Sequence, residues 1–297
     1  MAIATDFSNP LTPSGNLPRR ALVDRIMRWS AAGAALLAVF VLGVVLYTVI
    51  KNGASVLSWN FFTQSAPIDG AGGGIAPFII GTLLLVAAAA VVAVPLGVLI
   101  AIFLTEYAGP RAAFPVRLAL DLLNGLPTIV IGMFLFGLLV VGHHQSGFAA
   151  SLALAIIMVP LIARAAQEVL LLVPQSQRDA AHALGMSRWR TTLGVVLPAC
   201  VSGIITGTVL AVARAAGETA PLIALSSFFQ PNTPVTVNFF GQAIPNITYE
   251  IFNQTEQANP ADHARAWGAA LVLMAMILIA NFAARALLAR SRRKMFR

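Results

Sequence analysis

Long apolar runs separated by short polar segments occupy most of the chain. A helix needs about 20 apolar residues to cross a bilayer, and six runs are candidates: residues 30–50, 76–104, 117–141, 148–173, 195–225 and 266–288. The second run contains Pro95 and Gly97 and the fifth contains Gly217 and Pro221, so we expect tilts or kinks there. The pattern predicts an all-α integral membrane protein with six transmembrane helices.

Composition supports this prediction. The chain has 297 residues, of which 58% are hydrophobic and only 10% charged, whereas a soluble domain is about 45–50% apolar and about 25% charged. A single cysteine, Cys200, cannot form an internal disulfide, and we interpret it as a small core residue. Residues 1–28 are polar and basic, without a short apolar core and cleavage site, so the first apolar run is expected to be an uncleaved anchor.

The basic residues gather on one side of the predicted spans. If the N-terminus is cytoplasmic, the outer segments hold only Lys51 and Arg265, and two arginines remain inside spans. The cytoplasmic segments then hold Arg19, Arg20, Arg25, Arg28, Arg111, Arg117, Arg178, Arg188, Arg190, Arg285, Arg290, Arg292, Arg293, Lys294 and Arg297. The net charge of +8 is therefore a topology signal rather than a nucleic-acid footprint, and both termini are predicted to be cytoplasmic.

This topology predicts four segments. Residues 1–28 form a cytoplasmic tail, 29–74 the first transmembrane helix with an outer loop, 75–290 the main transmembrane domain, and 291–297 a basic cytoplasmic tail. His143 and His144 fall in a short outer turn. Two adjacent histidines could bind a metal, but no third ligand is evident, so a solvated turn is the favoured interpretation and no metal site is predicted.

The predicted cytoplasmic loop 173–199 reads VPQSQRDAAHALGMSRWRTTLGVVLPA. It could be an amphipathic helix on the membrane surface, or a short helix whose small side chains let a partner approach closely. Its spacing resembles the EAA loop of ATP-binding-cassette importer permeases, with an aspartate in place of the usual glutamate. The matching residues are Asp179, Ala180, Ala181, Gly185, Val195, Leu197 and Pro198.

This resemblance implies a coupling helix that docks on a separate ATPase subunit. The chain itself has two lysines, Lys51 and Lys294, and neither lies in a G-x-x-x-x-G-K-[ST] loop. We therefore expect ATP and Mg²⁺ to bind the partner ATPase, with no cofactor and no catalytic residue on this chain.

Charged residues also occur inside the apolar runs. Residues 162–168 read IARAAQE and residues 212–218 read VARAAGE, so each places an arginine four residues before a glutamate on one helical face. Buried charge is costly unless it is paired, solvated or functional. An internal ion pair could fix helix packing, and a proton relay is disfavoured because no chain of titratable residues crosses the membrane.

The third explanation is an anion path. The guanidinium of Arg214 offers a planar fork of donors that matches phosphate or carboxylate oxygens. Glu218 would neutralise it when the path is empty, and could accept the hydroxyl of hydrogen phosphate. Because Pro221 cannot donate a hydrogen bond to the carbonyl of Gly217, the backbone is expected to open there.

The stretches ARAAGETAPL and LIARAAQEVLLLVPQSQRDAAHALG resemble the PstA family, one of two permease subunits of the bacterial phosphate importer, over roughly residues 75–290. The resemblance implies the MetI-like type I importer fold in the cell inner membrane. It also implies a PstC-like second permease, two copies of a PstB-like ATPase and an extracytoplasmic PstS-like phosphate-binding protein. Phosphate passage is associated in that family with residues matching Arg164, Arg214 and Glu218; we add Glu168 from its spacing and Thr219 from the same stretch.

Two alternatives remain. The same architecture could import another oxyanion, such as sulfate or molybdate, because arginine suits all of them. A membrane-bound enzyme acting on phospholipid head groups would need a nucleophile or metal set, for which only His143, His144 and His182 are available, so a non-enzymatic transport subunit is preferred.

Overall fold

The computed structural model describes residues 17–65, 73–227 and 239–295, and all regular structure within these ranges is helical. Contacts divide the chain into two units, Met1–Lys51 and Asn52–Arg297. The elements are α1 (Leu17–Gly53), η1 (Ala54–Val56), α2 (Trp59–Thr63), α3 (Ala76–Ile102), η2 (Phe103–Tyr107), α4 (Pro110–Gly125), α5 (Thr128–Leu135), η3 (Phe136–Val140), α6 (Gly147–Leu171), α7 (Gln175–Ala183), α8 (Arg188–Thr191), η4 (Thr192–Val196), α9 (Leu197–Ala216), α10 (Ala220–Leu225), α11 (Ile247–Thr255) and α12 (Pro260–Met295). The predicted all-α fold is confirmed.

The first unit consists of α1, a helix of 37 residues that contains the predicted span 30–50. It begins at Leu17, so part of the segment interpreted as a tail, 1–28, is helical. An ion pair one turn apart, between Arg28 and Asp24 at 2.7 Å, supports this polar beginning of the helix. The rest of that tail lies outside the described residues.

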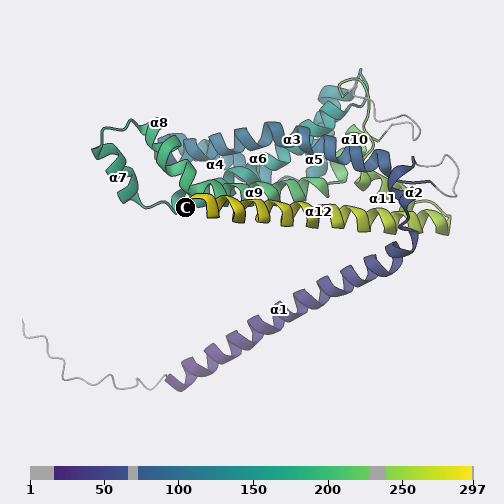
Figure 1. Cartoon of the computed structure of the whole chain (residues 1–297), viewed down its shortest axis with the longest axis horizontal. Helices are drawn as coiled ribbons and strands as arrows, with labels where there is room; N and C mark the ends of the chain where they lie inside the picture. Colours follow the sequence, from purple (N-terminus) through teal and green to yellow (C-terminus); the bar gives the residue numbers. More distant parts are fainter. Residues whose placement is uncertain (1–16, 66–72, 228–238, 296–297) are drawn as a thin grey trace, which may run out of the picture. The chain divides into compact units, whose positions relative to one another are not determined.

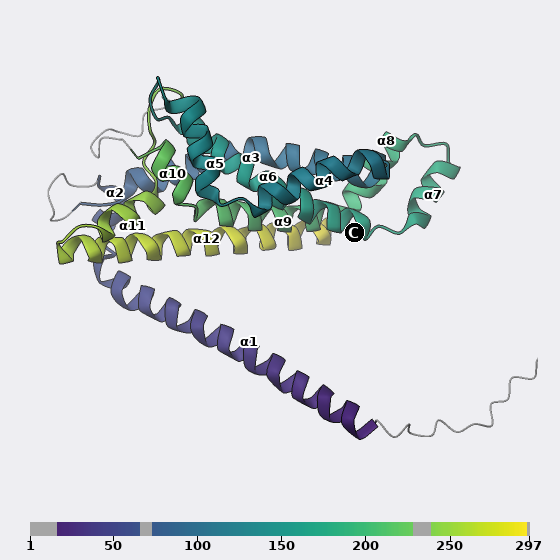
Figure 2. The same cartoon turned by 180° about the vertical axis from the view of Figure 1, so that it is seen from behind.

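The second unit is a bundle in which α3, α6, α9 and α12 lie side by side (Figures 1 and 2). α6 is its most buried helix, and Leu154, Met158 and Ile162 on it are almost inaccessible. One end of the bundle carries α7 and α8, and the other carries α2, α10 and α11 (Figure 1).

The third predicted span, residues 117–141, is not one helix. α4 and α5 meet at an angle of 99°, so the expectation of a single continuous helix was wrong. The cause is Pro127, because a proline disfavours helical backbone in the residue before it. Leu126 is accordingly extended, with φ −71° and ψ 136°, and the chain turns there.

The number of spans depends on this bent pair. Within the described ranges, five helices are long and apolar enough to cross a membrane, or six if the bent pair is one span. The fifth predicted run, 195–225, is broken as expected: α9 ends at Ala216 and α10 begins at Ala220, with Pro221 in its first turn.

Small residues allow α6 and α9 to pack closely. A Cβ built on Gly207 would lie 2.4 Å from the Cβ of Ala165, and one on Gly203 would lie 2.5 Å from a methyl of Val169. This is the small-x-x-x-small spacing that brings membrane helices together. Cys200 continues the same contact, since its Sγ donates to the carbonyl of Val169 at 3.3 Å. Its interpretation as a small core residue is confirmed.

Candidate functional site

The two faces of α9 differ sharply. Small and apolar side chains recur every three or four residues and are buried in the bundle: Cys200, Ile204, Gly207, Ala211 and Ala215. Arg214 lies on the opposite face with Thr206 and Leu210, all of them exposed. Its side chain is 58% exposed, so the guanidinium is not sealed inside the chain's own core.

Arg214 pairs with Glu218 as the four-residue spacing predicted. The Nε of Arg214 lies 3.6 Å from Oε1 of Glu218, whose side chain is only 14% exposed. Glu218 lies between the two helices, after Gly217 ends α9 and before Thr219, the half-buried N-cap residue of α10. The arginine is therefore in the last turn of its helix, and its partner is held by a break in the backbone.

Buried hydroxyl and amide groups support this break. The Thr248 hydroxyl donates to the backbone carbonyl of Glu218 at 3.0 Å, and its oxygen lies 2.9 Å from Oδ1 of Asn246. Asn246 in turn caps α11 by accepting from the Tyr249 N–H, and the Thr82 hydroxyl on α3 accepts from the Ile247 N–H at 2.9 Å. The carbonyl freed by the break is thus satisfied by protein groups, which fixes the position of the carboxylate beside Arg214.

Arg164 does not pair with Glu168. Its guanidinium forms an ion pair with Asp121 of α4, and both side chains are about half exposed. These two residues line a cavity of about 290 Å³, together with Arg117, Leu120, Gln167 and Leu171. Glu168 lies on the same exposed side of α6, one turn further along. Two arginines and one carboxylate give this cavity a positive balance that suits an anion.

Arg214 and Arg164 lie at different levels along the bundle. Gly207 faces Ala165 and Gly203 faces Val169, so the antiparallel helices place Arg214 level with residue 158 of α6. Arg164 is six residues further along, or about 9 Å at 1.5 Å per residue. The two predicted path arginines therefore belong to two separate charged sites, which we call stations. One is Arg214 with Glu218, and the other is Arg164 with Asp121, a partner that the sequence did not predict.

Within the loop with EAA spacing, α7 ends in a turn at Gly185. Gly185 has φ +78°, in the left-handed region. The N–H of Gly185 donates to the carbonyl of His182 and that of Met186 to the carbonyl of Ala181, at 2.9 and 3.1 Å. This is the Schellman arrangement, in which glycine after the last helical residue satisfies the final carbonyls. The backbone itself therefore favours glycine here.

The remaining loop residues divide between a packed and an open side. Ala181 is buried against the bundle, whereas Asp179 and Ala180 are exposed, and the amide of Gln175 donates to Asp179 at 3.1 Å. Leu184 is 83% exposed despite its size. At the far end of the loop, α9 begins with Leu197, which is half-buried, and Pro198, which is exposed. The open side thus offers small residues around one large apolar side chain.

Known transport proteins resemble this chain over most of its length. A protein-family model described as "Binding-protein-dependent transport system inner membrane component" matches residues 93–294. The chain belongs to this family. Among curated relatives, the phosphate transport system permease protein PstA of Yersinia pestis is 36% identical over 275 residues, covering 91% of both chains. PstA 1 of Mycobacterium tuberculosis (strain CDC 1551 / Oshkosh) is 34% identical over 246 residues, covering 81% of this chain and 80% of the relative.

Solved structures support the fold of this permease. A crystal structure of a bacterial ABC transporter involved in alginate import has a TM-score of 0.61 at 17% identity, covering 90% of this chain and 99% of that chain. An inward-facing MetNI methionine ABC transporter has a TM-score of 0.56 at 17% identity, covering 73% and 94%. The predicted resemblance to PstA and the MetI-like importer fold are confirmed, as is the assignment as a multi-pass inner membrane protein.

Sequence reasoning about this permease missed Asp121 and two buried ion pairs. Arg178 of α7 binds Glu106 at the end of η2 at 2.8 Å, and Arg265 of α12 lies 3.5 Å from Glu250 of α11. Burial is the main influence that raises the pKa of Glu250, against the opposing hydrogen bond from Gln254 and the charge of Arg265. The available signal was an acidic residue inside or beside an apolar run, as for Asp121 and Glu106.

Proposed function

We propose that this chain is the permease subunit of an ATP-driven importer of inorganic phosphate. It would form the translocation path with a second, PstC-like permease and accept phosphate from an extracytoplasmic PstS-like binding protein. Two PstB-like ATPase subunits would supply the energy, and ATP and Mg²⁺ would bind there. The names of the curated relatives support the phosphate specificity, and the basic residues on one side of the spans support cytoplasmic termini.

The observation that carries this proposal is the exposure of Arg214 within an otherwise apolar helix. A guanidinium facing lipid would be expensive, and the opposite face of α9 is already packed against α6. We infer that the exposed stripe with Leu210 and Arg214 faces a water-filled seam with the second permease. The arginine is then available to an anion on one side and to Glu218 on the other.

The path is proposed to use the two stations in sequence. Each presents a guanidinium whose charge is balanced by a carboxylate while no anion is bound: Glu218 for Arg214, and Asp121 for Arg164. An arriving anion would take the donors of one arginine and then those of the other, which lies about 9 Å further along the bundle axis. Thr219 and Glu168 would border the two stations. Two moderate sites permit release, which a single tight site would oppose.

The ATPase is proposed to dock on the open side of α7. Exposed Asp179 and Ala180 and the turn at Gly185 would lie against the partner, and the projecting side chain of Leu184 would fill a pocket on it. Ala181, by contrast, is buried. The movement of the ATPase subunits would switch the path between its outward-facing and inward-facing forms.

The main alternative is the same permease with another oxyanion, such as sulfate or molybdate. Glu218 is the feature that favours phosphate, because near neutral pH phosphate still carries a proton that a carboxylate can accept and sulfate does not. Uptake of labelled phosphate should be measured in vesicles with the complete complex, against a hundredfold excess of sulfate. We expect uptake to be unaffected by sulfate. Abolition of uptake by sulfate, with labelled sulfate itself imported, would replace phosphate as the substrate.

A further inference from the structure

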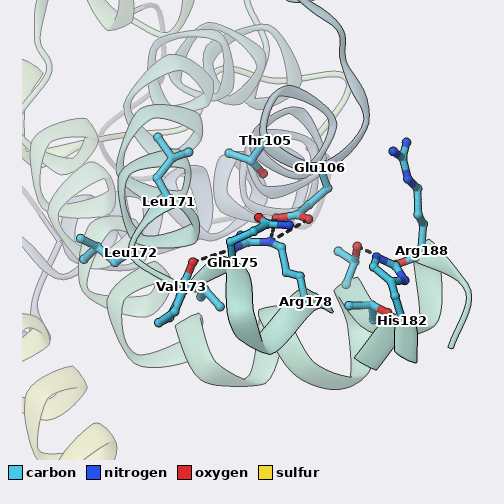
Figure 3. A pocket seen from close by; sticks show the side chains of 12 residues that line it. Thr105, Glu106, Leu171, Leu172, Val173, Gln175, Arg178, His182 and Arg188 are labelled. Atoms are coloured by element: carbon cyan, nitrogen blue, oxygen red, sulfur yellow. Dashed lines mark hydrogen bonds and ion pairs between the residues drawn. The ribbon is translucent and has the colours of Figure 1, made fainter. Parts of the chain in front are cut away.

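A buried ion pair connects α7 to the bundle at one side of a cavity of about 500 Å³ (Figure 3). Glu106 comes from η2, the π-helical turn that ends the α3 span, and Arg178 comes from the middle of α7. In Figure 3 the two side chains point toward one another, while Arg188 extends away from them. Both are largely buried, at 11% and 12% exposure.

The guanidinium of Arg178 contacts three segments at once. Its Nε donates to both carboxylate oxygens of Glu106, at 3.2 and 3.3 Å, and one terminal nitrogen donates to Oε1 at 2.8 Å. The same terminal nitrogen also donates to the carbonyl of Leu170 at 3.0 Å, and the other donates to the carbonyl of Val173 at 2.6 Å. All three nitrogens of the planar group therefore donate hydrogen bonds.

The carbonyls of Leu170 and Val173 explain why an arginine is suited to this place. They lie at the C-terminal end of α6, where the helix dipole favours a positive charge. Glu106 balances that charge in a site where an unpaired ion would be costly. A lysine could supply the charge, but not the planar fork that reaches all three acceptors.

We propose that Arg178 and Glu106 are positioning residues that transmit movement of α7 to α3 and α6. This proposal rests on the proposed function, in which an ATPase docks on α7. α7 follows α6 through the short connection 172–174 and packs against α8 and η4, while Asp179 and Ala180 on its other face are exposed. With the pair intact, displacement of α7 pulls the ends of both spans. Without it, α7 follows the ATPase while α6, which carries Arg164, stays behind.

The test compares Arg178→Lys and Glu106→Gln with the unmodified chain, each reconstituted in vesicles as the complete complex. Labelled phosphate uptake and ATP hydrolysis are measured in the same vesicles, and retention of the ATPase by co-purification. We expect both variants to retain the ATPase and hydrolyse ATP, while the ATP consumed per phosphate rises by about fivefold or more. Arg111→Lys is the matched control, since Arg111 is exposed at the start of α4, and its ratio should be unchanged.

The single variants Arg178→Ala and Glu106→Ala and the double variant Arg178→Ala/Glu106→Ala add a test of coupling between the two residues. If the two residues act as one link, the ratio of the double variant equals that of the more severe single alanine variant rather than the product of the two effects. An unchanged ratio in the single variants, a parallel fall of uptake and hydrolysis, or loss of the ATPase from the complex would each overturn the inference. Failure of the proposed function would appear separately, as absence of phosphate uptake by the unmodified complex.

Discussion

Substitution of Gly207 by alanine tests whether the contact between α6 and α9 sets the geometry of the arginine stations. The added Cβ would lie 2.4 Å from the Cβ of Ala165, whereas ordinary contact begins near 3.4 Å. The helices must therefore separate by about 1 Å at this point. Such overpacking costs about 1–3 kcal/mol, and the replacement of a helical glycine by alanine returns about 0.5–1 kcal/mol. We expect a net loss near 1 kcal/mol.

The compensating change lies directly opposite. In Gly207→Ala/Ala165→Gly the methyl group moves from one helix to the other, so the clash is removed and stability should return. Gly137→Ala is the control, because a Cβ there meets no atom within 4 Å. Thermal unfolding in detergent and phosphate uptake in vesicles are measured for each variant. Uptake should fall in Gly207→Ala, because Arg214 shifts relative to Arg164, and recover in the double variant.

Two results would refute this reasoning. If Gly207→Ala unfolds at the same temperature as Gly137→Ala, the close approach of α6 and α9 does not hold. If the double variant recovers stability but not uptake, the separation of the helices is not what positions the arginines.

Three further predictions concern separate parts of the chain. Glu218→Gln should reach near-normal abundance without transporting phosphate; reduced abundance with proportionate transport would indicate a packing role. Gly185→Asn, which tolerates a left-handed backbone, should retain the ATPase, whereas Gly185→Glu should insert in the membrane but lose it; equal co-purification of both would contradict docking at this turn. Burial raises the pKa of Glu250 above its ordinary value of 4.5. The contribution of this carboxyl group to the free energy of unfolding is therefore fully present below pH 4.5 and is lost as pH rises through the raised pKa. The melting temperature should therefore fall relative to Glu250→Gln as pH rises from 4.5, and parallel curves would contradict this.

Apolar periodicity was sufficient to predict the helical class and most of the long helices, because a bilayer requires helices of known length. It failed between residues 117 and 141, where the run is mostly apolar but Pro127 forces an extended residue and a sharp turn. The signal was present in the sequence. The break around Gly217 was predicted from the same chemistry, because Gly217 and Pro221 both lie in the fifth run.

The candidate site was predictable where the relevant contacts are local. Arg214 and Glu218 are four residues apart on the chain, and their pairing follows from helix geometry. The same rule pointed to Arg164 and Glu168, but the structure pairs Arg164 with Asp121 of another helix. Spacing within one helix cannot rank a local partner against one contributed by tertiary packing.

The loop with EAA spacing shows a further limit. Its glycine was recognised as a small residue for a partner, whereas the structure also favours it for a left-handed turn. Arg178 was counted only among the cytoplasmic basic residues, although its guanidinium is buried and contacts three segments. Long-range contacts of this kind leave little trace in a single sequence.

The most direct test of the account is phosphate uptake by the complete complex with Arg214→Ala. Uptake of labelled phosphate should be abolished while the second permease and the ATPase still co-purify with the variant, because the substitution removes the anion's donors and leaves the packed face of α9 intact. Uptake at the unmodified rate by an assembled Arg214→Ala complex would contradict the claim that this guanidinium receives the anion.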